Sequence, residues 1–252
     1  MIDPIHYPVL FLTALAAGFV DAIAGGGGLI TIPVLLNLGL PPQLALGTNK
    51  LQASFGSGSA AWHYARAGLV DVRACWAGVI CSFVGAVFGT LAVQCLSQAL
   101  LQRGLPWLLA GIALYVLLQP RAGTAPGRAR LQPATFYFLF GLAIGFYDGF
   151  FGPGTGTFWT MALILWLGYD LTRATAHTKL FNFASNIASL AAFLLAGNVL
   201  FAAGLVMAAG QLAGSWLGAH CVITRGTALV RPVFLTMVLA LIAKLLWQSW
   251  RT

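Results

Sequence analysis

The chain has 252 residues, of which 60% are hydrophobic and 7% are charged, whereas a soluble domain carries about 25% charged residues. It contains no Glu and five Asp, so it lacks the charged side chains that would cover a water-facing surface. The formal charge of +8 does not indicate nucleic-acid binding, because the Lys and Arg are scattered and form no basic cluster with interleaved aromatics. This composition predicts an all-α integral membrane protein.

Eight apolar stretches follow one another between charged residues and Pro/Gly breaks. They span residues 8–38, 43–65, 74–97, 104–119, 134–168, 173–196, 199–222 and 230–249. The first stretch is expected to stay in the mature protein, because the basic region that opens a signal peptide does not precede it. A hydrophilic linker, residues 121–133, follows the fourth stretch and divides the chain nearly in half.

The two halves, residues 1–120 and 134–252, resemble each other. From residue 39 onward a shift of 129 positions aligns Lys50 with Lys179, together with several Gly and Ala. Before that point a shift of 127 aligns Asp21 with Asp148, so two residues are gained near the glycine run. We therefore predict one transporter domain, residues 1–252, built from two pseudo-symmetric repeats of four segments each.

The first segment of each half contains a glycine-rich break, DAIAGGGGLIT at 21–31 and DGFFGPGTGTF at 148–158. A spanning helix needs about 20 residues, but residues 8–24 and 29–38 provide 17 and 10. Four consecutive glycines should end a helix, since each costs about 1 kcal/mol relative to Ala. We expect two half-helices in each segment, the second ones beginning near Leu29 and Thr157.

Each broken segment either turns back as a re-entrant hairpin or crosses as a discontinuous helix. If both cross, the Arg residues and Lys244 between segments divide seven to four; if both turn back, they divide eight to three, with Arg103, Lys244 and Arg251 outside. The rule that positive charge gathers on the cytoplasmic side favours the second arrangement. Each half then crosses three times, and the halves are inverted.

The glycine runs fit neither a P-loop nor a dinucleotide fingerprint, because the Lys and Ser/Thr of the first and the βαβ unit of the second are missing. A helix that begins at such a break presents free N–H groups and a positive dipole end, which attract anions. The alternative is that the glycines only permit tight helix packing. On the first reading the site includes Gly26, Gly27, Gly28, Gly154, Thr155 and Gly156.

Lys50 and Lys179 lie about two turns into apolar helices, where a charge costs roughly 2.5–3.5 kcal/mol. Each is flanked by polar side chains on one helix face, namely Asn49, Gln52, Thr178 and Asn182. These groups would coordinate an anionic substrate. The alternative is structural: the lysines snorkel or form buried ion pairs with Asp21 and Asp148. His177 is a candidate for proton coupling.

The remaining motifs are structural. GAVFG at 85–89 and GQLAGSWLG at 210–218 favour close helix contact. The four cysteines lie in apolar segments without a CxxC pair, so no disulfide, metal or other cofactor is expected. The sequence offers no Ser-His-Asp set or paired carboxylates, so we do not expect an enzyme.

AGFVDAIAGGGGLITIP followed by ALGTNKLQASFGSGSA resembles the TauE/SafE family of sulfite exporters, especially its YfcA-like branch. GFYDGFFGPGTGTFW with ATAHTKLFNFASNIASL resembles the second repeat of that family. The resemblance covers nearly the whole chain. It implies a multi-pass inner-membrane protein that moves small anions, often sulfur-containing ones such as sulfite or sulfoacetate. It also implies that the two glycine breaks and the Asn49-Lys50 and Thr178-Lys179 motifs form the site.

Together these observations predict a secondary transporter that works by alternating access around a central anion site. An anion channel and a membrane-embedded assembly subunit without transport of its own are the alternatives. The expected partners are a small anionic substrate and the lipid bilayer, with a second copy of the chain as a further candidate.

Overall fold

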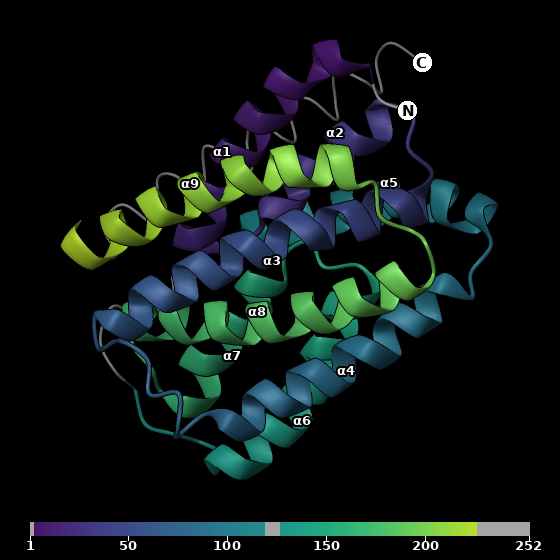
Figure 1. The fold of residues 1–252 in the computed structure, drawn as a ribbon. Helices are drawn as coiled ribbons and strands as arrows, with labels where there is room; N and C mark the ends of the chain where they lie inside the picture. Colours follow the sequence, from purple (N-terminus) through teal and green to yellow (C-terminus); the bar gives the residue numbers. More distant parts are fainter. Residues whose placement is uncertain (1–2, 119–126, 226–252) are drawn as a thin grey trace.

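A computed structural model describes residues 3–118 and 127–225, and within these ranges the chain is helical with no strand (Figure 1). A short 3-10 turn, η1 (Pro4–His6), precedes the first long helix. The α-helices are α1 (Tyr7–Ala24), α2 (Gly27–Asn37), α3 (Pro42–Arg66), α4 (Trp76–Gln94), α5 (Gln98–Leu118), α6 (Pro133–Phe150), α7 (Thr155–Leu167), α8 (Leu171–Leu195) and α9 (Phe201–Arg225).

The predicted segments match these helices closely. Residues 8–38 and 134–168 each form two helices, as the glycine breaks indicate. The helix expected from residue 104 begins at Gln98 and continues through Pro106. Four of the described helices, α1, α4, α8 and α9, are long and apolar enough to cross a membrane. The eighth predicted segment, 230–249, lies outside the described residues.

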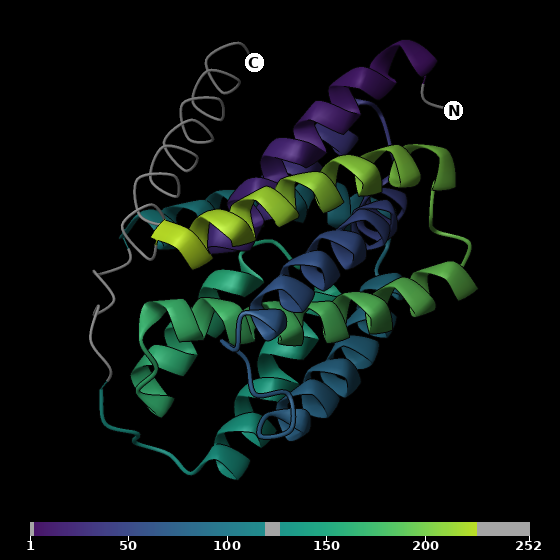
Figure 2. The same ribbon diagram turned by 60° about the vertical axis from the view of Figure 1, so that its left-hand side comes forward.

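The described helices form two outer pairs with two further helices between them. α1 packs along α9 and α6 packs along α4, while α3 and α8 lie between these two pairs and contact each other (Figures 1 and 2). α3 also packs on α9, and α8 also packs on α4. The two helices that carry the buried lysines therefore lie at the centre of the bundle.

Glycines allow the outer helix pairs to approach backbone to backbone. A Cβ added at Gly89 of α4 would overlap the carbonyl oxygen of Phe146 in α6, and one at Gly214 of α9 would overlap the carbonyl oxygen of Leu15 in α1. Both glycines belong to the small-residue motifs at 85–89 and 210–218. The interpretation of these motifs as close helix contacts is confirmed.

Both broken segments fold back as hairpins. Leu10 and Ala14, near the start of α1, share one buried cluster with Leu35, near the end of α2. Just before α6, the backbone N–H of Arg130 donates to the carbonyl oxygen of Trp166 near the end of α7, at 2.8 Å. In each hairpin the outer ends of the two helices therefore lie side by side, which agrees with the re-entrant arrangement and not with a discontinuous helix.

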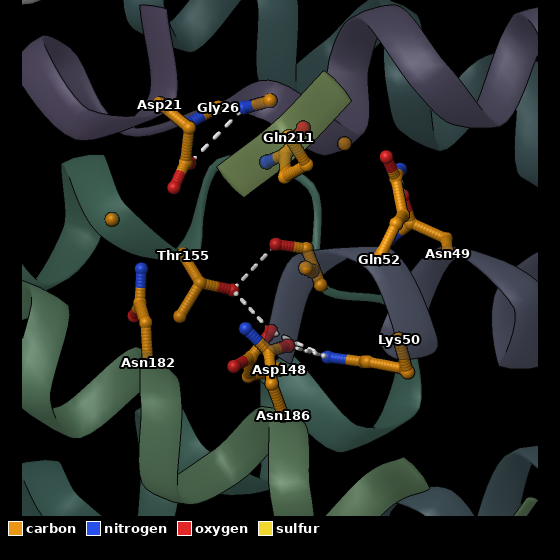
Figure 3. A pocket seen from close by; sticks show the side chains of 15 residues that line it. Asp21, Gly26, Asn49, Lys50, Gln52, Asp148, Thr155, Asn182, Asn186 and Gln211 are labelled. Atoms are coloured by element: carbon orange, nitrogen blue, oxygen red, sulfur yellow. Dashed lines mark hydrogen bonds and ion pairs between the residues drawn. The ribbon is translucent and has the colours of Figure 1, made fainter. Parts of the chain in front are cut away.

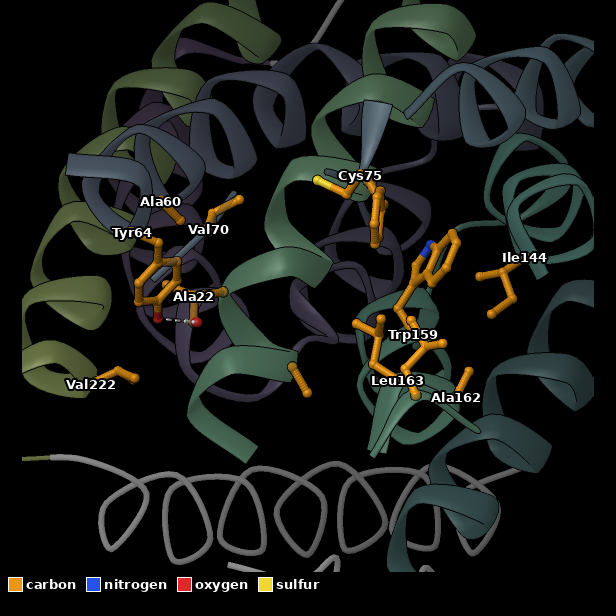
Figure 4. Packing of buried hydrophobic residues seen from close by; sticks show 14 of the residues in the cluster. Ala22, Ala60, Tyr64, Val70, Cys75, Ile144, Trp159, Ala162, Leu163 and Val222 are labelled. Carbon is orange, nitrogen blue, oxygen red and sulfur yellow. Dashed lines mark hydrogen bonds between the residues drawn. The ribbon is translucent and has the colours of Figure 1, made fainter. Parts of the chain in front are cut away.

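A buried hydrophobic cluster that includes several aromatic rings packs between the helices (Figure 4). The ring centroids of Trp159 in α7 and Phe181 in α8 lie 4.5 Å apart, and the Tyr64 hydroxyl donates to the carbonyl oxygen of Ala22 at 2.9 Å. On the outside, large apolar side chains are exposed, among them Trp107 at 81% and Leu195 at 92%. Such an apolar exterior suits contact with lipid.

Candidate functional site

The two glycine breaks meet at the centre of the molecule. Gly25 and Gly26 have φ of 75° and 114°, and Gly152 and Gly154 have φ of 92° and 81°, a region that glycine adopts far more readily than other residues. A Cβ added at Gly156 would lie 2.7 Å from the Cα atom of Gly25. The breaks therefore both redirect the chain and bring the two hairpins into backbone contact.

The second helix of each hairpin starts two residues before its predicted position, at Gly27 and Thr155. In α2 the reason is the Asp21 side chain, whose Oδ1 accepts from the backbone N–H groups of Gly26 and Gly27 at 3.0 and 3.1 Å. These N–H groups are thus satisfied within the protein. The prediction that the α2 N-terminus offers its first N–H groups to an anion is wrong for this pair.

Each buried lysine forms an ion pair with an aspartate from the opposite half of the chain. Lys50 Nζ lies 2.8 Å from Asp148 Oδ1, and Lys179 Nζ lies 3.0 Å from Asp21 Oδ2. The lysines are buried and do not snorkel to the surface. The aspartates occupy the last turns of α1 and α6, where a helix C-terminus disfavours negative charge, so the lysines supply the compensation that the sequence predicts.

The two aspartates differ in their surroundings. Asp148 also accepts from the hydroxyl groups of Thr155, at 3.1 Å, and Ser185. Its side chain is 4% exposed, whereas that of Asp21 is 17% exposed. The Asp21 Oδ2 atom has the Lys179 ammonium as its one partner among the described residues. Each aspartate therefore accepts three hydrogen bonds, but Asp21 is the more exposed of the two.

Of the polar side chains beside the lysines, Asn49 and Gln52 line the central cavity and Thr178 does not. Asn49 Oδ1 accepts from Gln52 Nε2 at 2.8 Å and from the Thr31 hydroxyl at 2.6 Å. In the second half, Thr178 instead pairs with the Thr160 hydroxyl at 3.1 Å.

His177 lies apart from the polar groups around the lysines. Its Nδ1 lies 2.8 Å from the Arg173 carbonyl oxygen, and its ring packs on Tyr169 with centroids 5.0 Å apart. It is not among the residues that line the central cavity.

A small cavity lies where the breaks and the lysine-bearing helices meet (Figure 3). The cavity volume is ≈ 30 Å³, about twice what a single water needs. The lining residues are Asp21, Gly26, Gly27, Gly28, Asn49, Lys50, Gln52, Ala53, Asp148, Gly152, Thr155, Gly156, Asn182, Asn186 and Gln211. The structure thus gathers most of the predicted site residues around one cavity.

Three of the predicted binding residues do not line the cavity. Gly154 faces Ile112 of α5, and Thr178 faces Thr160. Lys179 lies directly behind the lining, because its Nζ is 3.0 Å from Asp21 and would lie 3.5 Å from a Cβ added at Gly156.

Gln211 is a lining residue that the sequence analysis missed. Its α9 segment, GQLAGSWLG, was interpreted only as a packing motif, and the packing role holds for the neighbouring glycines. Gln211 is nevertheless 2% exposed and directs its amide toward the cavity (Figure 3). The available signal was an amide side chain within an otherwise apolar helix, since such groups are rare inside membranes and face the bundle interior.

The two lysines at and behind the cavity lining have hydrogen-bond donors that are not fully used. A lysine ammonium has three N–H donors. Lys179 has one acceptor among the described residues, Asp21, and Lys50 has two, Asp148 and Asn186. Buried donors without acceptors are unfavourable by about 1–3 kcal/mol each. An anion in the cavity would supply the missing acceptors.

The described residues contain no group of three or more His, Cys, Asp or Glu that would hold a metal ion. The four cysteines, Cys75, Cys81, Cys95 and Cys221, are free thiols. The cavity instead combines ammonium, amide and hydroxyl groups with two carboxylates. Such a set is suited to binding a small charged solute without changing it chemically.

Comparison with known proteins gives a consistent picture over nearly the full chain. Residues 10–245 match the profile of the family described as Sulfite exporter TauE/SafE. A probable membrane transporter protein of Haemophilus influenzae is 46% identical over 247 residues, 96% of this chain and 95% of the relative. The probable membrane transporter protein YfcA of Escherichia coli is 42% identical over 249 residues, 99% and 93% of the two chains.

A more distant relative and the solved structures complete the comparison. The probable membrane transporter protein YdhB of Bacillus subtilis is 25% identical over 239 residues, 92% of this chain and 96% of the relative. No solved structure matches the chain.

Proposed function

The chain belongs to the sulfite exporter TauE/SafE family and is a multi-pass membrane transporter, and from this premise we propose that its cargo is a small, sulfur-containing anion. Sulfite is the cargo that the family description names, and sulfoacetate is the organosulfur candidate. The proposed location is the inner membrane. An enzymatic role has no support among the names of the relatives, which are transporters.

One observation carries this proposal: two buried lysines with unused N–H donors lie at the meeting point of two glycine breaks. The cavity beside them is small, which favours a compact anion over a large organic one. Amide groups of Asn49, Asn182 and Gln211 line the same space and provide further donors without adding charge. A sulfur oxyanion has several acceptor oxygens on one centre and suits such a ring of donors.

We further propose that the two halves are inverted repeats around this site. The ion pairs support this arrangement, because Lys50–Asp148 and Lys179–Asp21 correspond under the sequence shifts of 129 and 127. The contacts of Gly214 with Leu15 and of Gly85 with Leu142 correspond in the same way. Inverted repeats are the usual basis of alternating access, in which one unit rocks against the other around a fixed site.

Counterflow in proteoliposomes tests the proposal against its alternatives. Vesicles are loaded with unlabelled sulfite or thiosulfate, and labelled anion is added outside at a low concentration. A carrier accumulates label transiently and saturates, whereas a channel only equilibrates it and an assembly subunit does neither. The expected result is saturable counterflow that is lost in Lys50→Ala. Equilibration without accumulation, or no flux in either protein, would reject the proposed carrier.

A further inference from the structure

The charges around the cavity indicate what must accompany the anion, and this inference rests on the proposed function. We propose that the cavity binds its anion together with one proton, which is taken up by Asp21. The substrate class is thus an anion plus a proton, bound as a neutral pair. The consequence is a transporter in which the anion and the proton move in the same direction.

The first step is the charge balance. The two buried lysines are matched one to one by the two aspartates, so these four groups carry no net charge before any ligand enters. A monovalent anion would leave an unbalanced negative charge in a buried site, and uncompensated buried charge is strongly unfavourable. A positive charge must therefore enter with the anion, and a proton on a carboxylate requires the least space.

The second step is the choice of carboxylate. Asp148 accepts from three side chains, Lys50, Thr155 and Ser185, and its own side chain is 4% exposed. Asp21 holds the N–H groups of Gly26 and Gly27 with Oδ1, while Oδ2 has Lys179 as its one partner among the described residues. Asp21 is also the more exposed of the two.

Anion binding changes the hydrogen bonds of Asp21 and Lys179. Asp21 lines the cavity, and Lys179 directly behind it has two N–H donors without an acceptor in the described part of the chain, so an anion in the cavity can approach Asp21 Oδ2. A like charge at that distance favours protonation of the carboxyl group. The protonated Oδ2 then changes from an acceptor to a donor and gives its hydrogen bond to the anion, while Oδ1 keeps its two backbone contacts.

The other ionisable groups that face Asp21 leave it as the acceptor of the proton. They come from three helices: Lys50 and Tyr64 of α3, Asp148 of α6 and Lys179 of α8. Each lysine is already paired with an aspartate, and the Tyr64 hydroxyl donates to the Ala22 carbonyl oxygen. The α2 and α7 segments at the cavity contribute glycine and threonine only.

Titration calorimetry of the purified protein measures this proton directly. Methanesulfonate and ethanesulfonate are the probes, because both are monovalent anions whose charge stays constant across the neutral pH range, whereas sulfite itself titrates there. Each titration is run in two buffers of different ionisation enthalpy, so that the heat reports the protons taken up per anion. We expect about one proton per anion, and binding that weakens up to tenfold per pH unit.

Two variants locate the proton. Asp21→Asn is expected to bind the anion with no proton uptake and no pH dependence, because its amide resembles the protonated acid. Ser185→Ala, which removes a donor to Asp148 in the other half without changing any charge, is the control and should retain uptake. Anion binding by the wild type without proton uptake, or with a requirement for sodium, would overturn the inference, even if Asp21→Asn does not fold. A wild type that binds neither probe at any pH would instead reject the proposed function itself.

Discussion

The two lysine–aspartate pairs show how far single residues can be interpreted without a structure. Each lysine in an apolar helix predicts a cavity or a partner, because an isolated charge there is unfavourable. Each aspartate before a helix break predicts a compensating cation. The sequence leaves open which pairs form, since that depends on how α3 and α8 cross. In the structure each pair joins the two halves, with N–O distances of 2.8 and 3.0 Å.

The pairing predicts a specific pattern of stability. In Lys50→Met the Asp148 carboxylate loses its cation while it stays buried, and we expect the free energy of unfolding to fall by about 3–5 kcal/mol. Adding Asp148→Leu should cost much less than it does in the wild type, because the partner charge is already gone. Thermal unfolding in detergent measures all three variants. Arg73→Met, at an exposed cation, is the control and should stay within about 0.5 kcal/mol. Additive losses would contradict the pairing.

The contacts of Gln211 and Ser185 could not be predicted from the sequence. The residues around each of them in the sequence already predict helix packing, so the sequence gives no reason to assign Gln211 or Ser185 a further role. Both act on groups that come from distant parts of the chain, the central cavity and Asp148 respectively. Such a contact depends on tertiary structure and leaves no local pattern in the sequence.

At the scale of elements, the sequence predicts where the helices lie. It does not predict the exact residues at which the second helix of each hairpin begins. Apolar length and glycine breaks indicate the half-helices, because a run of glycines ends a helix whatever surrounds it. The starts of α2 and α7 were misplaced by two residues. In α2 this reflects the Asp21 carboxylate, which satisfies the first N–H groups and allows Gly27 into the helix. A side-chain cap from the preceding helix is not a signal that residue order alone reveals.

The hairpins predict where each loop meets water. In a cysteine-free background, Ile5→Cys and Asn37→Cys flank the first hairpin and should react with a membrane-impermeant maleimide from the same side. Arg128→Cys and Arg173→Cys flank the second hairpin and should react only from the opposite side, because inverted halves face opposite ways. All four positions are exposed. Labelling of intact and of opened cells compares the two sides. If the two residues of one hairpin react from different sides, that segment crosses the membrane.

The glycines between paired helices predict another measurable loss. A Cβ in Gly89→Ala would overlap the Phe146 carbonyl oxygen, so α4 and α6 must separate. We expect a destabilisation of about 1–3 kcal/mol. Gly111→Ala in α5 is the matched control, because no heavy atom lies within 4 Å of its added Cβ, and its stability should be unchanged or higher. Equal melting temperatures for the two variants would show that the helix pair does not depend on close approach.

At the scale of the whole molecule, the proposed inverted repeat makes one site out of two unequal halves. The sequence shift places Asn49 opposite Thr178 and Gln52 opposite Phe181. Asn49 and Gln52 line the cavity, whereas Thr178 pairs with Thr160 and Phe181 packs on Trp159. Equivalent positions of the two halves therefore contribute different side chains to the cavity. Sequence comparison of the halves predicts this inequality, but the position of the cavity depends on the packed structure.

The most direct test of the anion site is ligand-induced thermal stabilisation of the purified wild type, Lys50→Ala and Lys179→Ala in detergent. The anions are sulfite, thiosulfate, sulfate, sulfoacetate, taurine and simple carboxylates. A ligand at about ten times its dissociation constant adds about 1.4 kcal/mol of stability. We expect that at least one sulfur anion stabilises the wild type and neither variant. Stabilisation that persists in both variants, or its absence from the wild type with every anion, would contradict it.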